Sequence, residues 1–541
     1  MPKLRGADIV VRTLENAGLT DIFTLSGNHI MSLFDAAIDS KLQLVHVRHE
    51  AATVHMADSY GRLTGRPGIA WVTGGPGHAN AVGALFTALG QETPMILISG
   101  HTETDQLGRG GFQELRQVDM AAPVTKAAWM ATDGATIGMD IAKAVRIATS
   151  GRPGPVALSL PSDVLDATVE ADAIVWPSAA DYAAEPMPLP GAATDAILSL
   201  LKDAKHPLIL GAPVLANAAG RALLRRIEDA LHIPTCLSEG PRSFNDASLG
   251  RYAEVAQRAD LVVLLGKAMD FTVKFGGAPF SPDCRFIVIE PDGAILNRAV
   301  GFKGPLLAFG CVADTIPAAE ILIARGAGKG LGNKAWVEEA HALFCDRPAA
   351  WKDLRSSAPD KLHPAQVFYT LQRFLTPGSV LIADGGEFSQ WGQSILRNER
   401  RMINGVTGSI GSSLPMAAGA RVVERNAPVF AVLGDGTFGF HMSEIETAVR
   451  CGLPYVAIVG TDCRWNAEYN LQVRDYGPNR TFGCELDPTR YDLVATALGG
   501  HGELVTRAED LGPAIERSLA SGKPAVVNVM IESIPSPVIR R

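Results

Sequence analysis

The sequence predicts an α/β protein made of three doubly wound parallel-sheet domains. Its 541 residues are too many for one hydrophobic core and suit about three domains of ordinary size. Short apolar and β-branched runs alternate with helix-like stretches, which indicates parallel sheets covered by helices on both faces. Two stretches without this alternation, 166–193 and 326–359, separate the chain into three blocks.

The first block, residues 1–165, opens with an amphipathic helix pattern and continues with five strand-like runs separated by helix-length segments. In such units the functional groups collect beyond the carboxyl ends of the strands. The five runs are 21–25, 44–47, 68–72, 95–98 and 156–160.

The remaining blocks repeat the pattern on either side of the second linker. Residues 166–193 are rich in Pro and Ala and predict a linker, and a Gly-rich stretch at 325–332 marks the start of the second. The central α/β block is 194–325 and the last block is 360–541. Their strand-like runs are 207–210, 261–265 and 286–289, then 380–383, 429–433, 455–459 and 525–529.

The composition is that of a globular enzyme. Hydrophobic residues make up 47% and charged residues 20%, and the net charge of −8 argues against a nucleic-acid surface. The seven cysteines form no C-x-x-C pair, which favours reduced thiols. No run approaches 18 apolar residues and the N-terminus has no apolar signal segment, so we expect a cytoplasmic protein that does not bind a membrane.

The turn Gly434-Asp435-Gly436 carries the strongest functional signal. It follows the strand-like run 429–433 and precedes a helix-like stretch at 442–450. A helix N-terminus attracts anions, so an Asp beside a phosphate requires a divalent cation between them. Asp462 ends the next strand-like run, 462 − 435 = 27 positions on, and offers a second oxygen ligand. This spacing predicts a site for a metal ion and a phosphate.

Two other interpretations fit the same residues. Gly434, Gly436 and Gly439 match the G-x-G-x-x-G spacing of dinucleotide-binding turns. Asp435 argues against direct contact with a pyrophosphate, because a carboxylate suits a cation better. A structural strand–turn–helix without a ligand is the second alternative.

Four further motifs, in order along the chain, give the sequence a family resemblance. They are Arg-His-Glu-Ala-Ala at 48–52, Gly-Gly-Pro-Gly at 74–77, Phe-Gln-Glu at 112–114 and Ala-Pro-Val-Thr-Lys at 122–126. With the three α/β blocks and the 434–436 turn, the chain resembles the thiamine diphosphate-dependent decarboxylase and carboligase superfamily. Within it, benzaldehyde lyase and the acetolactate synthase large subunit are most similar. The blocks then correspond to pyrimidine-binding, central and diphosphate-binding domains.

The resemblance implies roles for individual residues. Glu50 would hydrogen-bond the cofactor pyrimidine and favour the imino form that removes the C2 proton; an exposed strand-end glutamate is the alternative. Asp435, Asp462 and the Arg464 backbone carbonyl would bind Mg²⁺. The Gly408 carbonyl would meet the pyrimidine amine, and Ile410 would be the wedge that bends the cofactor. The other expected cofactor contacts are Thr73, Pro76, Asn80, Gly386, Glu387, Phe388, Gly434, Gly436, Thr437, Trp465 and Asn466.

Two positions depart from the family pattern. Most relatives have Asn where this chain has Asp462, so the second metal ligand becomes a carboxylate. The added charge predicts tighter binding of a hard cation. Asn466 replaces a common Gly, and we expect it to keep a left-handed turn, which Asn tolerates.

Three side chains, His29, Gln113 and Glu468, are predicted to act on the substrate. His29 matches the histidine of benzaldehyde lyase and would move a proton, or would only hydrogen-bond the backbone. Gln113 matches a glutamine of acetolactate synthases, and Glu468 resembles the glutamate of pyruvate decarboxylases, with an exposed helix residue as its alternative. The expected pocket walls are Ser26, Asn28, Phe112, Trp465 and Tyr469, of which the aromatic residues fit core packing equally well.

The leading prediction is an enzyme dependent on thiamine diphosphate and Mg²⁺ that makes or cleaves a C–C bond next to a carbonyl of a 2-keto acid, aldehyde or acyloin. The first alternative is a 2-hydroxyacyl-CoA or oxalyl-CoA type lyase, in which Lys267 and Lys274 would contact a nucleotide, unless they are simply solvated. A non-catalytic regulatory subunit and an NAD(P)-dependent dehydrogenase are the others. By resemblance the site needs two chains, so we expect at least a homodimer and predict a homotetramer.

Overall fold

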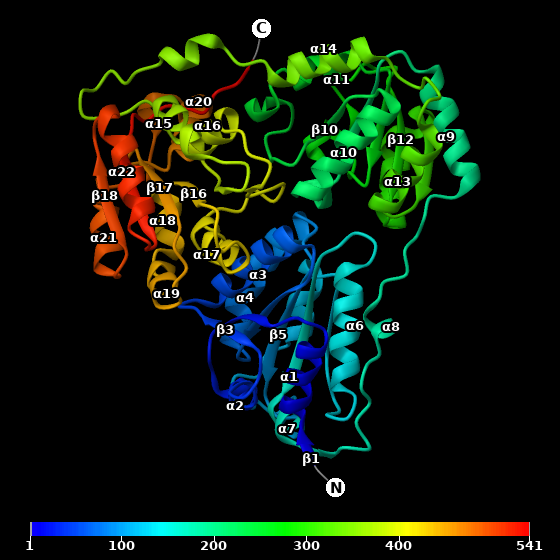
Figure 1. Ribbon diagram of the computed structural model, residues 1–541, viewed down its shortest axis with the longest axis vertical. Coiled ribbons are helices and arrows are strands. Elements are labelled where there is room, and N and C mark those ends of the chain that lie inside the picture. The colour runs from blue at the N-terminus through cyan, green and yellow to red at the C-terminus, as the bar shows by residue number, and fades with distance from the viewer. Residues whose placement is uncertain (1–2, 540–541) are drawn as a thin grey trace.

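The computed structural model describes residues 3–539 and contains three sheet-centred domains (Figure 1). In Figure 1 the N-terminal domain is blue to cyan, the central domain green, and the C-terminal domain yellow to red. Each domain contains one parallel sheet, and the only antiparallel strand pair among the described residues is β1 (Lys3–Arg5) with β8 (Thr168–Glu170). The predicted fold class, three parallel α/β domains, is therefore confirmed.

The N-terminal sheet has the strand order β3-β2-β4-β5-β7-β6. The order reverses between β2 and β4, and ligands of such sheets bind at this switch point. The strands are β2 (Asp21–Thr24), β3 (Gln43–His46), β4 (Gly68–Val72), β5 (Met95–His101), β6 (Ala127–Met130) and β7 (Pro155–Pro161). The main helices are α1 (Gly6–Asn16), α2 (Met31–Ala37), α3 (Glu50–Thr64), α4 (Pro76–Gly90), α5 (Gln117–Ala121), α6 (Ile137–Thr149) and α7 (Ser162–Asp166).

The central sheet has the order β10-β9-β11-β12-β13, with its switch point between β9 and β11. Its strands are β9 (Pro207–Gly211), β10 (Thr235–Leu237), β11 (Leu261–Leu265), β12 (Arg285–Glu290) and β13 (Leu307–Val312). The helices are α9 (Gly191–Asp203), α10 (Ala218–Leu231), α11 (Tyr252–Arg258), α12 (Gly293–Lys303), α13 (Thr315–Gly326) and α14 (Lys334–Cys345). Helix α14 lies inside the segment predicted as the second linker, and its Trp336 is buried in the central core.

The C-terminal sheet has the order β15-β14-β16-β17-β19-β18, with its switch point between β14 and β16. The strands are β14 (Val380–Ala383), β15 (Arg401–Ile403), β16 (Val429–Gly434), β17 (Val456–Thr461), β18 (His501–Val505) and β19 (Ala525–Met530). The helices are α15 (Pro364–Leu371), α16 (Glu387–Ile395), α17 (Ser413–Val423), α18 (Asp435–His441), α19 (Glu444–Arg450), α20 (Asn466–Tyr476), α21 (Tyr491–Ala497) and α22 (Ala508–Ala520).

The N- and C-terminal domains share one hydrophobic core. Helices α3 and α17 pack side by side between the two sheets (Figure 1). At their crossing a Cβ on Gly419 would lie 2.7 Å from the Met56 Cα, so only glycine permits this approach. The shared cluster extends from Phe23 under β2 to Val459 under β17. Each terminal domain also has a hydrophobic cluster of its own, whereas both clusters of the central domain are composed of its own residues.

Candidate active site

A small cavity opens at the switch point of the C-terminal sheet. It has a volume of about 80 Å³ and lies beyond the ends of β14, β16 and β17. The helix-like stretch predicted at 442–450 is α19 (Glu444–Arg450), but a further helix that was not predicted, α18, begins at Asp435, so the acid lies in its first turn. The cavity is lined by Gly385, Gly386, Glu387, Phe388, Ile410, Gly434, Asp435, Gly436, Thr437, Gly460, Asp462, Arg464, Trp465, Asn466, Ala467 and Glu468.

Two buried carboxylates face this cavity from neighbouring strand ends. The Asp435 oxygens accept hydrogen bonds from the Gly436 amide at 2.9 Å and the Cys463 amide at 2.8 Å. Burial raises the pKa of Asp435 to about 6, although these amides oppose the rise. Burial and the nearby Asp435 charge raise the pKa of Asp462 to about 7. Two carboxylates that disfavour each other's charge are what a bound cation would stabilise.

The donor set fits Mg²⁺ but does not complete its coordination. Asp435 and Asp462 supply hard oxygen ligands, while no cluster of three or more His, Cys, Asp or Glu side chains suited to a metal occurs within residues 3–539. Backbone carbonyls, water or ligand phosphate must therefore supply the remaining positions. Asp435, Gly436 and Thr437 of the first turn of α18 line the same cavity, so a diphosphate would lie beside the cation at a helix N-terminus.

A third acid, Asp384, organises the loops on the other side of the cavity. It follows β14, is 1% exposed, and accepts hydrogen bonds from the amides of Gly385 (2.7 Å), Gly411 (3.0 Å) and Ser413 (3.2 Å). It therefore fixes both the Gly385–Gly386 turn and the loop that carries Ile410. Asp384 was not predicted from the sequence, although the strand–Asp–Gly–Gly pattern at its position resembles the 434–436 turn.

Of the two loop residues expected to contact the cofactor, Ile410 lines the cavity and Gly408 does not. The Ile410 side chain lies so close to Gly385 that a Cβ there would approach its Cγ2 within 2.6 Å. Gly408 has a left-handed φ of 68° and lies in the same loop, but it does not line the cavity. The proposed contacts of both residues with a cofactor stay predictions.

Helix α20 places the residues after Asp462 unevenly around the cavity. Glu468 is exposed and lines it, as do Trp465 and Asn466. Tyr469 does not line it; its ring lies 4.2 Å below the Arg464 guanidinium.

The expectation for Asn466 was wrong, because this residue is the first of α20. The left-handed position is Cys463, with φ 62°. The turn is therefore made three residues earlier than the family pattern suggested.

The N-terminal domain gathers the other predicted residues at its own switch point. Glu50, the first residue of α3, accepts a hydrogen bond from Asn80 Nδ2 at 3.0 Å, and a Cβ on Gly77 would lie 3.4 Å from its Oε1. The start of α4, with Pro76 exposed, is thus beside the Glu50 carboxyl group. Glu50 does not line the Asp435 cavity of the same chain.

The His29 side chain is buried at this edge of the sheet. It is 4% exposed, its Nδ1 is 3.2 Å from Thr73 Oγ1 and its Nε2 is 3.2 Å from the Phe112 carbonyl oxygen. Burial lowers its pKa, so the neutral ring is favoured. Gln113 follows with a left-handed φ of 56° and packs against Gly75.

The polar residues at the end of β2 are more open. Ser26 and Asn28 are both exposed, and the Ser26 hydroxyl lies 2.9 Å from His46 Nε2. Phe112 is 64% exposed and stacks on the His29 ring with centroids 5.8 Å apart. The substrate roles of these residues remain predictions.

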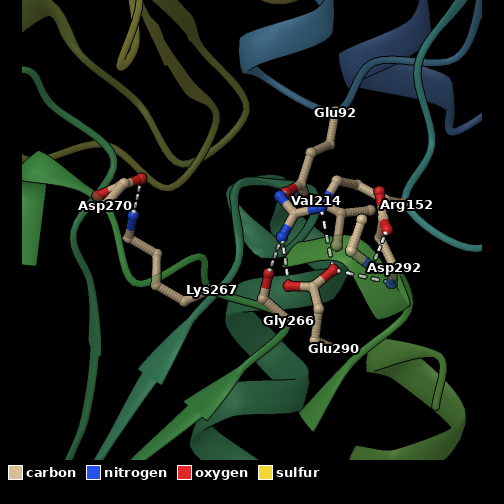
Figure 2. Close-up of polar contacts among 9 residues, drawn as sticks. Glu92, Arg152, Val214, Gly266, Lys267, Asp270, Glu290 and Asp292 are labelled. Atoms are coloured by element: carbon tan, nitrogen blue, oxygen red, sulfur yellow. Dashed lines mark hydrogen bonds and ion pairs between the residues drawn. The ribbon is translucent and has the colours of Figure 1, made fainter. Parts of the chain in front are cut away.

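The corresponding edge of the central sheet carries an ion cluster (Figure 2), and a cavity of about 700 Å³ lies beside it, lined in part by Glu92 and Val214. Arg152, from the loop before β7, donates to the Gly266 carbonyl oxygen at 2.8 Å and to Glu290 Oε2 at 2.5 Å, and it also pairs with Glu92. Glu92 Oε2 accepts the Val214 amide hydrogen at 3.0 Å. Groups of the N-terminal domain thus occupy the β9/β11 switch point.

The two lysines considered as nucleotide contacts differ in their surroundings. Lys267 is 1% exposed and pairs with Asp270 at 2.8 Å, to one side of the cluster in Figure 2, so it is not solvated. Lys274 is exposed, with a left-handed φ of 50°. With Lys267 buried against Asp270 and Lys274 exposed, the two lysines do not form a common ligand site.

Comparison with known proteins agrees with this geometry. Residues 4–120 match the family described as "Thiamine pyrophosphate enzyme, N-terminal TPP binding domain", and residues 384–529 match "Thiamine pyrophosphate enzyme, C-terminal TPP binding domain". Thiamine pyrophosphate is another name for thiamine diphosphate. Within the described residues no helix is long and apolar enough to cross a membrane.

Relatives with several reactions align over almost the whole chain. A probable acetolactate synthase of Mycobacterium bovis is 30% identical, with 97% of this chain and 95% of the relative covered. Human 2-hydroxyacyl-CoA lyase 2 is 28% identical, with 97% and 90% covered. A sulfoacetaldehyde acetyltransferase of Alcaligenes xylosoxydans is also 28% identical, with 98% and 93% covered. The chain therefore belongs to the thiamine pyrophosphate enzyme family and is a thiamine pyrophosphate-dependent enzyme related to acetolactate synthases and 2-hydroxyacyl-CoA lyases.

Proposed function

We propose that this enzyme uses thiamine diphosphate and Mg²⁺ to make or cleave a C–C bond next to a carbonyl group of a 2-keto acid, aldehyde or acyloin. The observation that carries the metal assignment is the pair Asp435 and Asp462, two buried carboxylates with raised pKa values at one glycine-lined cavity. A cation between them, with diphosphate on the first-turn amides of α18, removes the electrostatic cost of the arrangement.

The chain's own residues bind, orient and hold protons around the cofactor. Thiamine diphosphate, when bound, supplies the acidic carbon that adds to a carbonyl and stabilises the charge left when the neighbouring C–C bond breaks. Glu50 would share a proton with the pyrimidine ring. Asp384 holds the loop in which Ile410 would press against the cofactor. His29 and Gln113 would contact the substrate oxygen from the N-terminal edge.

The two halves of this site would come from two chains. Glu50 lies at the edge of one domain and Asp435 lines a cavity that does not include Glu50. A neighbouring subunit would bring its Asp435 edge to this chain's Glu50 edge. We therefore propose a homodimer as the minimal active form, and a homotetramer as the full assembly. Sedimentation velocity with and without cofactor would measure the state, and an active monomer would contradict the proposal.

A substrate screen tests the reaction. Pyruvate, benzoin, other acyloins and acyl-CoA substrates would be offered with thiamine diphosphate and Mg²⁺, with EDTA as the metal control. We expect turnover only with both cofactors. A separate NMR measurement of C2-proton exchange on bound cofactor compares the wild type with Glu50→Gln. Equal exchange rates would overturn the catalytic assignment of Glu50 and favour a non-catalytic subunit.

Acyl-CoA cleavage is the second candidate, because a relative with that printed name aligns over the whole chain. Faster turnover of an acyl-CoA than of the free acid would select it. Arg152 and Glu92 occupy the β9/β11 switch point itself, but the cavity of about 700 Å³ beside them leaves room for a substrate that carries a nucleotide.

A further inference from the structure

Two side chains of α19, a short helix of the C-terminal domain, hold the turn that leads into Glu50. The Arg48 amide donates to Glu444 Oε1 at 3.1 Å and to Oε2 at 3.3 Å. At the other end of α19, Arg450 Nη2 donates to the His46 carbonyl oxygen at 2.6 Å. The last residue of β3 and the middle of the β3–α3 turn are therefore both held by one helix from another domain.

Glu444 is built into this contact rather than resting on the surface. Its side chain is 0% exposed, and Thr447 Oγ1 donates to its Oε2 at 2.7 Å. Burial raises its pKa, and the hydrogen bonds from Thr447 and from the backbone amide of Arg48 oppose the rise. A buried carboxylate is costly unless its oxygens are satisfied, so the Arg48 amide is a required partner and not an incidental contact.

Glu50 depends directly on where this turn lies. It is the first residue of α3, two positions after Arg48, and His49 caps the helix by accepting the Ala51 amide hydrogen at 3.1 Å. The His49 ring also contacts the His441 ring edge-on, with centroids 5.9 Å apart. A shift of the turn would carry the Glu50 carboxyl group with it, and a misplacement of about 1 Å at a reacting group costs about 100-fold in rate.

We propose that Glu444 is a positioning residue for Glu50. By accepting the Arg48 amide hydrogen, Glu444 fixes the position of the β3–α3 turn. That position sets the distance from the Glu50 carboxyl group to the pyrimidine nitrogen of the cofactor. This inference rests on the proposed function, because it assumes that Glu50 activates the cofactor. If the contact only held the two domains together, its loss would lower stability but would not change the rate of C2-proton exchange.

The test compares Glu444→Ala with Glu239→Ala. Glu239 is an equally buried carboxylate, paired with Arg221 and Arg401 away from the β3–α3 turn, and so controls for a general loss of stability. In Glu444→Ala we expect C2-proton exchange to slow about 10- to 100-fold. The dissociation constant for thiamine diphosphate should change less than about 5-fold, because the diphosphate end is untouched. Glu239→Ala should exchange at the wild-type rate.

Two milder variants extend the test if Glu444→Ala does not fold. Thr447→Val removes only the hydroxyl donor and should slow exchange about 3- to 10-fold. Glu444→Gln keeps one oxygen for the Arg48 amide and should recover most of the wild-type rate. Equal slowing in Glu444→Ala and Glu239→Ala, or no slowing in Glu444→Ala, would overturn the proposal.

A cofactor-free readout separates this proposal from the proposed function. Amide hydrogen exchange of the peptide containing Arg48, followed by mass spectrometry on the apo protein, should speed up in Glu444→Ala. Unchanged protection would overturn the contact even if the wild type binds the cofactor. If the wild type did not bind the cofactor, the proposed function would be overturned. Amide hydrogen exchange would still report whether Glu444 holds the Arg48 amide.

Discussion

The C-terminal and central sheets differ in how the charge of the buried carboxylates at their switch points is balanced. Both are parallel sheets that present buried carboxylates beyond their strand ends. At the C-terminal edge Asp435 and Asp462 face a cavity. At the central edge Arg152 lies between Glu92 and Glu290 (Figure 2), and these partners raise the pKa of its guanidinium although burial opposes them.

This difference separates carboxylates that the chain neutralises itself from carboxylates that suit a bound cation. A carboxylate pair balanced by the chain's own guanidinium is a finished structural element. In the pair Asp435 and Asp462 burial raises both pKa values, the Asp435 charge raises that of Asp462 further, and a cation would stabilise the ionised forms. The same topology therefore produces a cofactor site in one domain and an inter-domain clamp in another, and a few side chains decide which.

Asp435→Ala should have the largest effect on the comparison. It removes a predicted metal ligand, and since changes beside metal ligands alone cost about 10–100-fold in affinity, we expect at least about 100-fold weaker binding of thiamine diphosphate with Mg²⁺. Isothermal titration calorimetry measures it. Asp292→Ala, at the strand end of the central sheet, is the control and should bind like the wild type. Equal affinity in both variants would contradict the contrast between the two edges.

Arg152→Ala should break the central edge. It leaves Glu92 and Glu290 buried without a partner, so the free energy of unfolding should fall by about 3 kcal/mol. Arg226→Ala, whose pair with Glu320 is exposed, should cost less than about 1 kcal/mol. Urea unfolding measures both. A combined Glu92→Gln, Arg152→Met, Glu290→Gln variant should regain most of the loss, and an Arg152→Ala protein as stable as Arg226→Ala would show that the clamp is unimportant.

Asp384→Asn should loosen the C-terminal edge without removing a metal ligand. The carboxylate accepts three backbone amide hydrogens, and the amide side chain cannot satisfy all of them. A loss of about 1–2 kcal/mol in cofactor binding follows, which is about 10-fold in the dissociation constant. Wild-type affinity together with a wild-type C2-exchange rate would remove Asp384 from the site.

Asp462→Asn should have the smallest and most informative effect. Because the folded pKa of Asp462 is raised from 3.8 to about 7, the metal-free protein loses stability as the pH rises between these two values, and the loss is complete above pH 7. The variant should therefore gain about 1 kcal/mol in the free energy of unfolding at pH 8 without metal, and lose about 10-fold in Mg²⁺ affinity. Thermal unfolding across a Mg²⁺ series reads both, and an unaltered metal dependence would exclude Asp462 as a ligand.

The sequence predicted the inner strands better than the outer ones. All twelve predicted runs are strands in the structure, because buried parallel strands are uniformly apolar. The strands that were not predicted, such as β6 and β18, lie mainly at sheet edges, where one side is open and the apolar pattern weakens. The start of α18 at Asp435 was not predicted, because this helix contains glycines, which disfavour a helix.

The candidate site was predictable where a residue acts through its own side chain. Asp435 and Asp462 follow predicted strands, Glu387 and Ile410 were assigned by the family resemblance, and all four line one cavity. Asp384 and Glu444 act through hydrogen bonds to backbone amides, and for Glu444 the amide is almost 400 positions away. No local pattern records such a partner, so these residues required the structure.

The hydrophobic cluster shared by the terminal domains has a consequence for how the molecule unfolds. Because α3 and α17 bury each other, neither terminal domain can open without exposing the other, and the two should melt as one cooperative unit. The central domain has cores of its own and should melt separately. Calorimetry should therefore resolve two transitions, and thiamine diphosphate with Mg²⁺ should shift only the one that belongs to the ends of the chain.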